Sequence, residues 1–198
     1  MDPRSKISSK GGRGSRRIVI ALFGALTIAS LAATSLSLAL FTDSQAAGGN
    51  AFTTGTITLG LNPTSAIFSS GAMMPGDSAN GSLVVSNTGT AQLRYAVTSS
   101  STNADGKGLN AQLTVTIRTL GTSCAVFDGT SLFSGTLSTA AFGDVTPGAQ
   151  AGDRTLAAAS NETLCFRATL PSGTGNAFQG ATTTATFTFQ AEQTANNP

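Results

Sequence analysis

Residues 113–118 read Leu-Thr-Val-Thr-Ile-Arg, so an apolar residue alternates with a polar one at every step. Successive side chains of an extended chain point to opposite faces. This period of two therefore predicts a strand with one face in a core and the other in solvent. Threonine suits the outward face because it favours strands and keeps the sheet soluble. The stretch indicates a half-buried β-strand.

Several other stretches show the same alternation or a short apolar run: 57–61, 83–85, 92–97, 164–170 and 184–189. Turn-forming residues separate them, at 75–77, 87–89, 103–108, 128–129, 147–148 and 171–175. Short strands with frequent turns predict an all-β fold, an antiparallel jelly-roll-like β-sandwich. The turn at 87–89 predicts a hairpin between the strands around Leu83 and Tyr95. The one helical candidate is short and lies at 156–161.

The N-terminus has the pattern of a secretory signal peptide at 1–39, with a basic n-region at 1–17 and an apolar h-region at 18–36. Small residues permit cleavage after Ala39, which would leave Leu40 first, or after Ala46. The alternative is a permanent membrane anchor, because the uncharged run is long enough to span a bilayer. One β-sandwich domain, 40–198, follows the leader.

The positive charge of the chain belongs mostly to this leader. The whole chain has a formal net charge of +2, but after Ala39 it has five basic and eight acidic residues, or −3 (5 − 8). A basic surface for nucleic acid is therefore not expected. The chain contains no His, which excludes Ser-His-Asp triads, Cys-His pairs and His-ligated zinc. We nominate no catalytic, cofactor-binding or metal-binding residue and expect no enzyme activity.

The two cysteines, Cys124 and Cys165, both lie in the body of the chain. In an oxidising compartment such a pair usually forms a disulfide, which is our prediction. Two buried free thiols, or a redox-active pair, are the alternatives. The sequence leaves N-glycosylation open at Asn80 and Asn161, which begin formal acceptor triplets.

Five aspartates lie near predicted turns, where they can either bind calcium or cap the local backbone. They lack the spacing of a calcium loop, so capping is the preferred interpretation. They are Asp77, Asp105, Asp128, Asp144 and Asp153.

Three parts of the chain resemble the TasA/camelysin family of secreted bacterial proteins, which includes biofilm-matrix fibre subunits. Residues 38–44 and 50–59 are similar to its aromatic-x-Asp segment and F-x-x-G-T-x-x-L strand. Residues 74–77 and 83–89 are similar to its P-G-D turn and N-T-G hairpin, and 170–180 with 187–193 to its closing strand pair. The stretch 100–160 contributes little, and the cysteine pair is not general in the family.

The resemblance implies export with a dedicated signal peptidase, which favours cleavage after Ala39, and assembly into extracellular fibres. It implies that each subunit donates an N-terminal strand to its neighbour. The donor candidate is 40–50, with Leu40, Phe41, Asp43 and Ala46 in the strand and Phe41 as its apolar anchor. Expected partners are copies of the chain, signal peptidase and another matrix protein. A monomeric surface adhesin or carbohydrate-binding module is the second interpretation, and a camelysin-type metalloprotease the third.

Overall fold

The structure is a computed structural model of the 198-residue chain, and it describes residue 49 and residues 51–197. The chain divides into two units, Met1–Phe52 and Thr53–Pro198. Every strand described below belongs to the second unit. The predicted signal peptide, both cleavage positions and the donor residues Leu40, Phe41, Asp43 and Ala46 lie outside the described residues.

The regular elements of the second unit are mostly strands, with only three short helical turns among them. In chain order they are β1 (Leu59–Asn62), β2 (Ser78–Asn87), β3 (Leu93–Ser101), α2 (Leu109–Gln112), β4 (Thr114–Thr119), β5 (Ser131–Thr136), η1 (Leu137–Thr139), β6 (Arg154–Leu156), β7 (Ser160–Thr169), η2 (Asn176–Phe178) and β8 (Ala185–Gln193).

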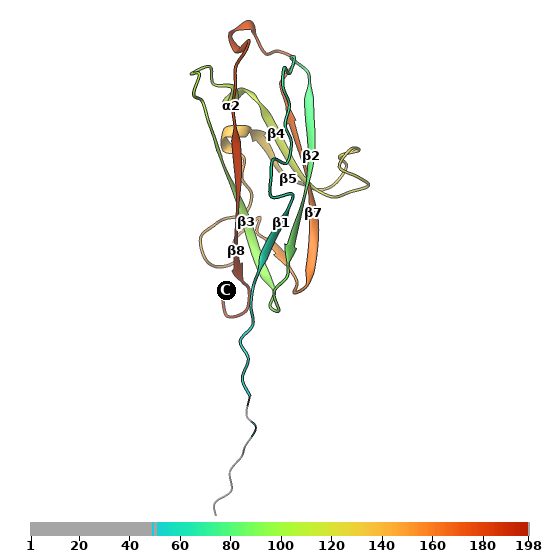
Figure 1. The fold of residues 1–198 in the computed structure, drawn as a ribbon, viewed down its shortest axis with the longest axis vertical. Coiled ribbons are helices and arrows are strands. Elements are labelled where there is room, and N and C mark those ends of the chain that lie inside the picture. Colours follow the sequence, from blue (N-terminus) through green and yellow to red (C-terminus); the bar gives the residue numbers. More distant parts are fainter. Residues whose placement is uncertain (1–48, 50, 198) are drawn as a thin grey trace, which may run out of the picture. The chain divides into compact units, whose positions relative to one another are not determined.

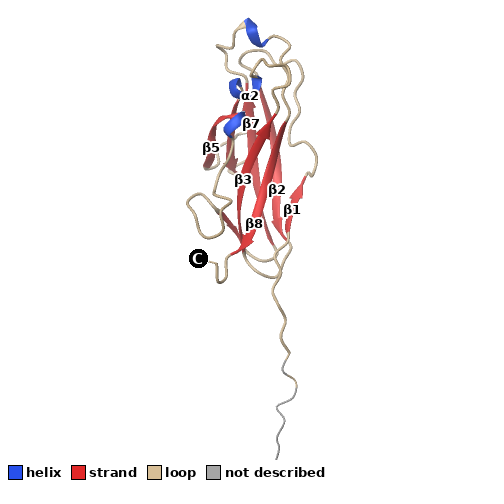
Figure 2. Cartoon of the chain, turned by 90° about the vertical axis from the view of Figure 1, so that its left-hand side faces the viewer, coloured by secondary structure: helices blue, strands red, loops and turns tan. Residues whose placement is uncertain are grey.

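The strands form two antiparallel sheets. One sheet has the order β1-β2-β7-β4-β5 and the other the order β6-β3-β8. Every strand pair is antiparallel. Figures 1 and 2 show β3 and β8 in one layer and β2 and β7 in the other. The predicted all-β antiparallel sandwich is therefore confirmed.

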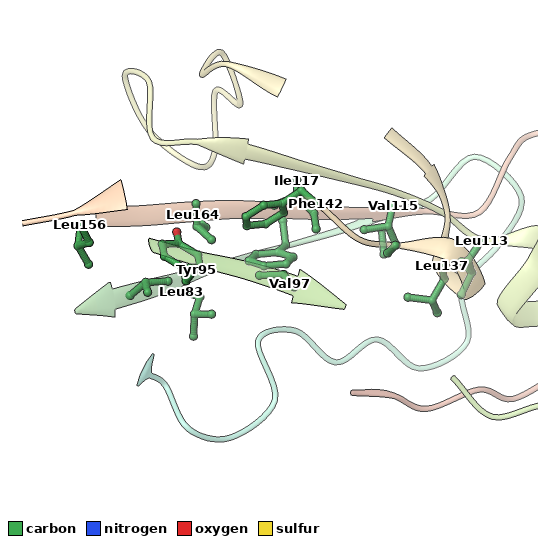
Figure 3. Close-up of a cluster of buried hydrophobic side chains, with 14 of the residues drawn as sticks. Leu83, Tyr95, Val97, Leu113, Val115, Ile117, Leu137, Phe142, Leu156 and Leu164 are labelled. Carbon is green, nitrogen blue, oxygen red and sulfur yellow. The ribbon is translucent and has the colours of Figure 1, made fainter. Parts of the chain in front are cut away.

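The core lies between the two sheets and follows the alternation seen in the sequence. Leu113, Val115 and Ile117 are buried, while Thr114 between them is exposed. Figure 3 shows inward side chains of β2, β3, β4 and β7 meeting between the layers. Burying these apolar faces is the main favourable contribution to folding, because it removes apolar surface from water.

The hairpin predicted at residues 87–89 is wrong, because β2 pairs with β1 and β7 while β3 pairs with β6 and β8. The turn instead carries the chain from one sheet to the other. Asn87 holds it in place with an almost fully buried side chain. Its amide donates to the carbonyls of Ala91, Leu156 and Ala157, and its Oδ1 accepts the Gly89 N–H.

The helix predicted at 156–161 is also wrong. Leu156 ends β6 and Ser160 begins β7, with a tight turn between them in which Ala159 has a φ of 53°. The three consecutive alanines at 157–159 favour a helix locally, but pairing of the flanking residues with β3 and β2 overrides that preference. Among the described residues, no helix has the length and apolar character needed to cross a membrane.

Candidate functional site: an open groove between the sheets

A cavity of about 600 Å³ opens between β8 and the segment that follows β1. Its floor comes from inward side chains of the larger sheet and its neighbours, namely Ala79, Leu83, Leu113, Leu137 and Ala168. One wall consists of residues 183–187 and Phe189. The opposite wall is formed by Leu61, residues 63–70 and Met73. We call this cavity the groove.

The apolar side chains of the β8 wall, Ala185, Phe187 and Phe189, are only half-buried. Phe187 packs on the core ring of Phe166 with 5.2 Å between the ring centroids. Phe189 packs on Tyr95 at 6.0 Å. Both phenylalanines also line the groove, so each ring has one side in the core and another toward the cavity. This wall therefore offers apolar surface that a further element could cover.

The opposite wall is the segment 63–73, which we call the strap. Its half-buried side chains Ile67, Phe68 and Met73 pack against the core. Ile67 lies directly over Gly81 of β2, where a side-chain Cβ would be 2.9 Å from Ile67 Cγ2. Only glycine permits that close approach, so β2 is adapted to receive the strap.

The groove carries no charge, since none of its lining residues is acidic or basic. A carboxylate fixes the chain where it enters the β8 wall. Asp105 accepts N–H groups from Lys107 at 3.0 Å and Thr182 at 2.7 Å. These hydrogen bonds, the one from Lys107 first, hold the pKa of Asp105 below its ordinary value. An apolar, uncharged segment is the kind of chain that such a groove can bury.

The opposite side of the sandwich is closed by polar contacts between the sheets. The Tyr95 hydroxyl donates to Glu162 Oε1 at 2.7 Å, and Glu162 also forms an ion pair with Arg154. Burial, followed by the hydrogen bond to Glu162, raises the pKa of Tyr95 strongly, so this tyrosine stays neutral. Phe142 completes this side by exchanging backbone hydrogen bonds with Val97.

The predicted disulfide between Cys124 and Cys165 is present, with 5.0 Å between the two Cα atoms. It ties the loop 120–130 to the outer face of β7 and thereby covers Cys165, which is 1% exposed. The Phe127 ring lies under the guanidinium groups of Arg118 and Arg167, at 5.2 and 4.0 Å. Cation–π attraction holds the loop against the sheet in addition to the covalent bond.

A smaller cavity of about 230 Å³ lies under the loop 143–153, away from the groove. Its charged groups are engaged within the protein. Arg94 forms an ion pair with Glu192 at 3.0 Å, and Glu192 accepts the Gly148 N–H at 3.0 Å. Asp153 accepts the N–H groups of Asp144 and Gln150. These contacts explain the conformation of the loop.

All five aspartates cap backbone groups, as preferred from the sequence. Their carboxylates accept N–H groups of Met74 (Asp77), Lys107 and Thr182 (Asp105), Thr122 (Asp128), Thr146 (Asp144), and Asp144 and Gln150 (Asp153). No three Cys, Asp or Glu side chains of the described residues are grouped as metal ligands would be.

Sequence reasoning did not find the groove. The alternation around Phe187 and Phe189 predicts an ordinary core face, and it cannot show that both rings border a cavity. The strap gave a weak signal, because Ile67 and Phe68 are adjacent apolar residues in a stretch without strand or helix periodicity. Of the adjacent residues Met73 and Met74, Met73 lies in the groove wall and Met74 is exposed.

A comparison with known proteins covers nearly the whole chain. The family model of the camelysin metallo-endopeptidases matches residues 15–197, which confirms the resemblance seen in the sequence motifs. No curated protein matches the chain.

Proposed function

The chain belongs to the camelysin metallo-endopeptidase family, and from this membership we propose that it is a secreted structural subunit of an extracellular biofilm-matrix or cell-surface fibre. One copy donates its N-terminal strand, residues 40–50, to the groove of the next copy. The partners are therefore copies of the same chain, with signal peptidase acting during export and another matrix protein as a further candidate.

The observation that carries this proposal is the groove beside an open strand edge. β8 pairs with β3 on one side, and no described strand pairs with its other side. Such an edge presents N–H and C=O groups that an added strand can bond, and the side chains of that strand can fill pockets below it. Phe187 and Phe189 supply those pockets in the groove.

The chemistry of the donor candidate suits this groove. Residues 40–50 read Leu-Phe-Thr-Asp-Ser-Gln-Ala-Ala-Gly-Gly-Asn, in which Asp43 is the only charged side chain. Phe41 is the apolar anchor that would complete the burial of the phenylalanines in the groove wall. An uncharged groove makes no charge pair with the strand, so apolar contact and backbone hydrogen bonds provide the affinity.

Electron microscopy of the mature secreted protein tests the proposal. At high concentration, negative staining should show filaments, and deletion of residues 40–49 should abolish them. Phe41→Ser should weaken assembly, while Gln45→Ser, which leaves the charge of the strand unchanged, is the matched control. Discrete particles across pH and salt would contradict the proposal and favour a monomeric adhesin or carbohydrate-binding module.

We also propose that the chain has no peptidase activity, despite the description of its family. A zinc peptidase of the H-E-x-x-H type needs two His ligands on one helix face, and this chain contains no His. Casein cleavage by the purified protein, measured with and without a chelator, tests this point. Cleavage that the chelator inhibits would contradict it.

A further inference from the structure

The strap, residues 63–73, differs from the chain on either side of it in its hydrogen bonding. None of its backbone or side-chain groups forms a hydrogen bond with another described residue. Immediately before it, Asn62 pairs with Val84 in the β1–β2 ladder. Immediately after it, the Met74 N–H donates to Asp77 Oδ2 at 2.7 Å. The strap is thus an unpaired segment held between two hydrogen-bonded anchors.

Apolar contacts alone hold the strap in place. Ile67, Phe68 and Met73 pack on the core, whereas Ser69 and Ser70 are exposed. Exposure lets the backbone groups of the serines bond to water, so the strap is tolerated without protein partners. The segment contains no charged residue, and Pro63 at its start is its only proline. Every residue of the strap after Pro63 therefore has an N–H that forms no hydrogen bond with another described residue.

The strap and β8 face the same cavity from opposite sides. Residues 183–187 and Phe189 form one wall and residues 63–70 with Met73 form the other. β8 is an edge strand, and the strap has no pairing in the described part of the chain. A strand lying in the groove would therefore meet unpaired backbone groups at both of its own edges.

We propose that the groove is a two-sided slot in which the strap becomes a β-strand when a second copy inserts residues 40–50. The inserted strand bonds to β8 along one edge and to the strap along the other, while its apolar side chains lie on the floor around Leu83. This inference rests on the proposed function and adds to it a step in which the unpaired strap of the acceptor becomes paired. Pairing at two edges satisfies the inserted backbone completely, as in the interior of a sheet.

Hydrogen exchange on the mature wild-type protein tests the slot directly. In filaments, the amides of the strap and of β8 should both exchange more slowly than in the monomer, by about tenfold or more. Slower exchange in β8 with unchanged exchange in the strap would overturn the two-sided slot and leave strand donation intact. Filaments that protect neither segment would contradict strand donation into this groove, and the slot with it.

Proline substitutions test the same inference through assembly. In Ser69→Pro and Ser70→Pro an N–H is removed that the monomer does not use, and neither position has a left-handed φ. Both variants should unfold at the wild-type denaturant concentration. Neighbouring N–H groups of a strand point to opposite edges, so one variant should assemble on the order of tenfold more slowly than the other.

Ser69→Ala and Ser70→Ala are the matched controls, because they remove the hydroxyl and keep the N–H. They should assemble like the wild type. If both proline variants also assemble like the wild type, the strap does not pair and the inference is overturned. If a proline variant fails to fold, hydrogen exchange on the wild type decides.

Binding of a peptide distinguishes strand donation into the groove from pairing of the strap. A synthetic peptide of residues 40–50 added to the chain lacking residues 40–49 should slow exchange in both walls of the groove. A peptide with Phe41→Ser is the control and should protect neither wall to the same extent. Absence of β8 protection at saturating peptide, together with absence of filaments from the wild type, would refute the proposed function itself.

Discussion

β3 and β8 are neighbours in one sheet, paired along their full lengths, yet they differ in burial. The inward side chains Tyr95 and Val97 of β3 are at most 1% exposed. Phe187 and Phe189 of β8 are only half-buried. β3 has β6 and Phe142 on its far side, whereas β8 borders the groove. The sandwich is therefore complete on one side and has room for a further strand on the other.

The same contrast appears in the polar contacts of the two sides. On the closed side, Asn87 and Glu162 link strands of both sheets through buried or half-buried hydrogen bonds. On the open side, the strap is held by apolar contacts without hydrogen bonds to described residues. Stability should thus be concentrated on the closed side, and adaptability on the open side.

Truncating a core phenylalanine and the groove-wall phenylalanine that packs on it, Phe166 and Phe187, should give the largest difference. Phe166 is 0% exposed, so Phe166→Ala should lower the free energy of unfolding by about 3–5 kcal/mol. Phe187→Ala should cost about half of that or less, because its ring already borders a cavity. Urea unfolding of both variants measures the difference. Equal losses would mean that the groove wall is packed as tightly as the core.

Removing the disulfide should have the next largest effect. The bond between Cys124 and Cys165 closes a separation of 41 residues, and its loss should cost about 2–4 kcal/mol. The double variant Cys124→Ala/Cys165→Ala, compared with the wild type by urea unfolding, measures the loss. Because the bond lies on the outer face of β7, hydrogen exchange of the strap should not change. A strap that exchanges faster in the variant would contradict the separation of the two regions.

Asn87→Ala tests the polar contacts of the closed side. The substitution leaves buried partner groups without hydrogen bonds and should cost about 2–3 kcal/mol. Asn80→Ala is the matched control, since Asn80 is exposed and accepts one hydrogen bond, from Arg167. It should change stability by less than about 0.5 kcal/mol. Thermal and urea unfolding give both values, and similar losses would remove the special role of Asn87.

The smallest effect concerns the pKa of one exposed carboxylate, that of Asp128. The hydrogen bond from the Thr122 hydroxyl, followed by that from its N–H, holds the pKa of Asp128 below the ordinary value of 3.8. Since the folded-state pKa is the lower one, the contribution to stability is present above pH 3.8 and is lost as the pH falls through the folded-state pKa.

Thr122→Val should therefore raise the pKa of Asp128 toward its ordinary value, and Thr122→Ser should largely preserve it. Carboxyl NMR titration measures both. The pKa of Asp105, near the groove, serves as the internal reference and should stay low in every variant. A shift of Asp105 together with Asp128 would show that the two loops are coupled.

The strand alternation predicted most of this fold, because period-two patterning is a local property of the chain. It located the buried faces of β4 and β7. The turn-forming residues between the strands located the aspartates that cap backbone groups. The alternation did not predict which strands pair, as the hairpin expected at residues 87–89 shows. Pairing depends on contacts between distant residues, such as those of Asn87 with Leu156 and Ala157.

By itself, the sequence determined the fold class, the cysteine pair, the family and the absence of histidine chemistry, since each depends on residue type and local spacing. Only the tertiary structure decided that β8 is an edge strand and that the strap faces it across a cavity. Phe187 has the same alternating neighbours as a core phenylalanine. What distinguishes it is the cavity that it borders among the described residues, and that is a property of how the two sheets are assembled in space.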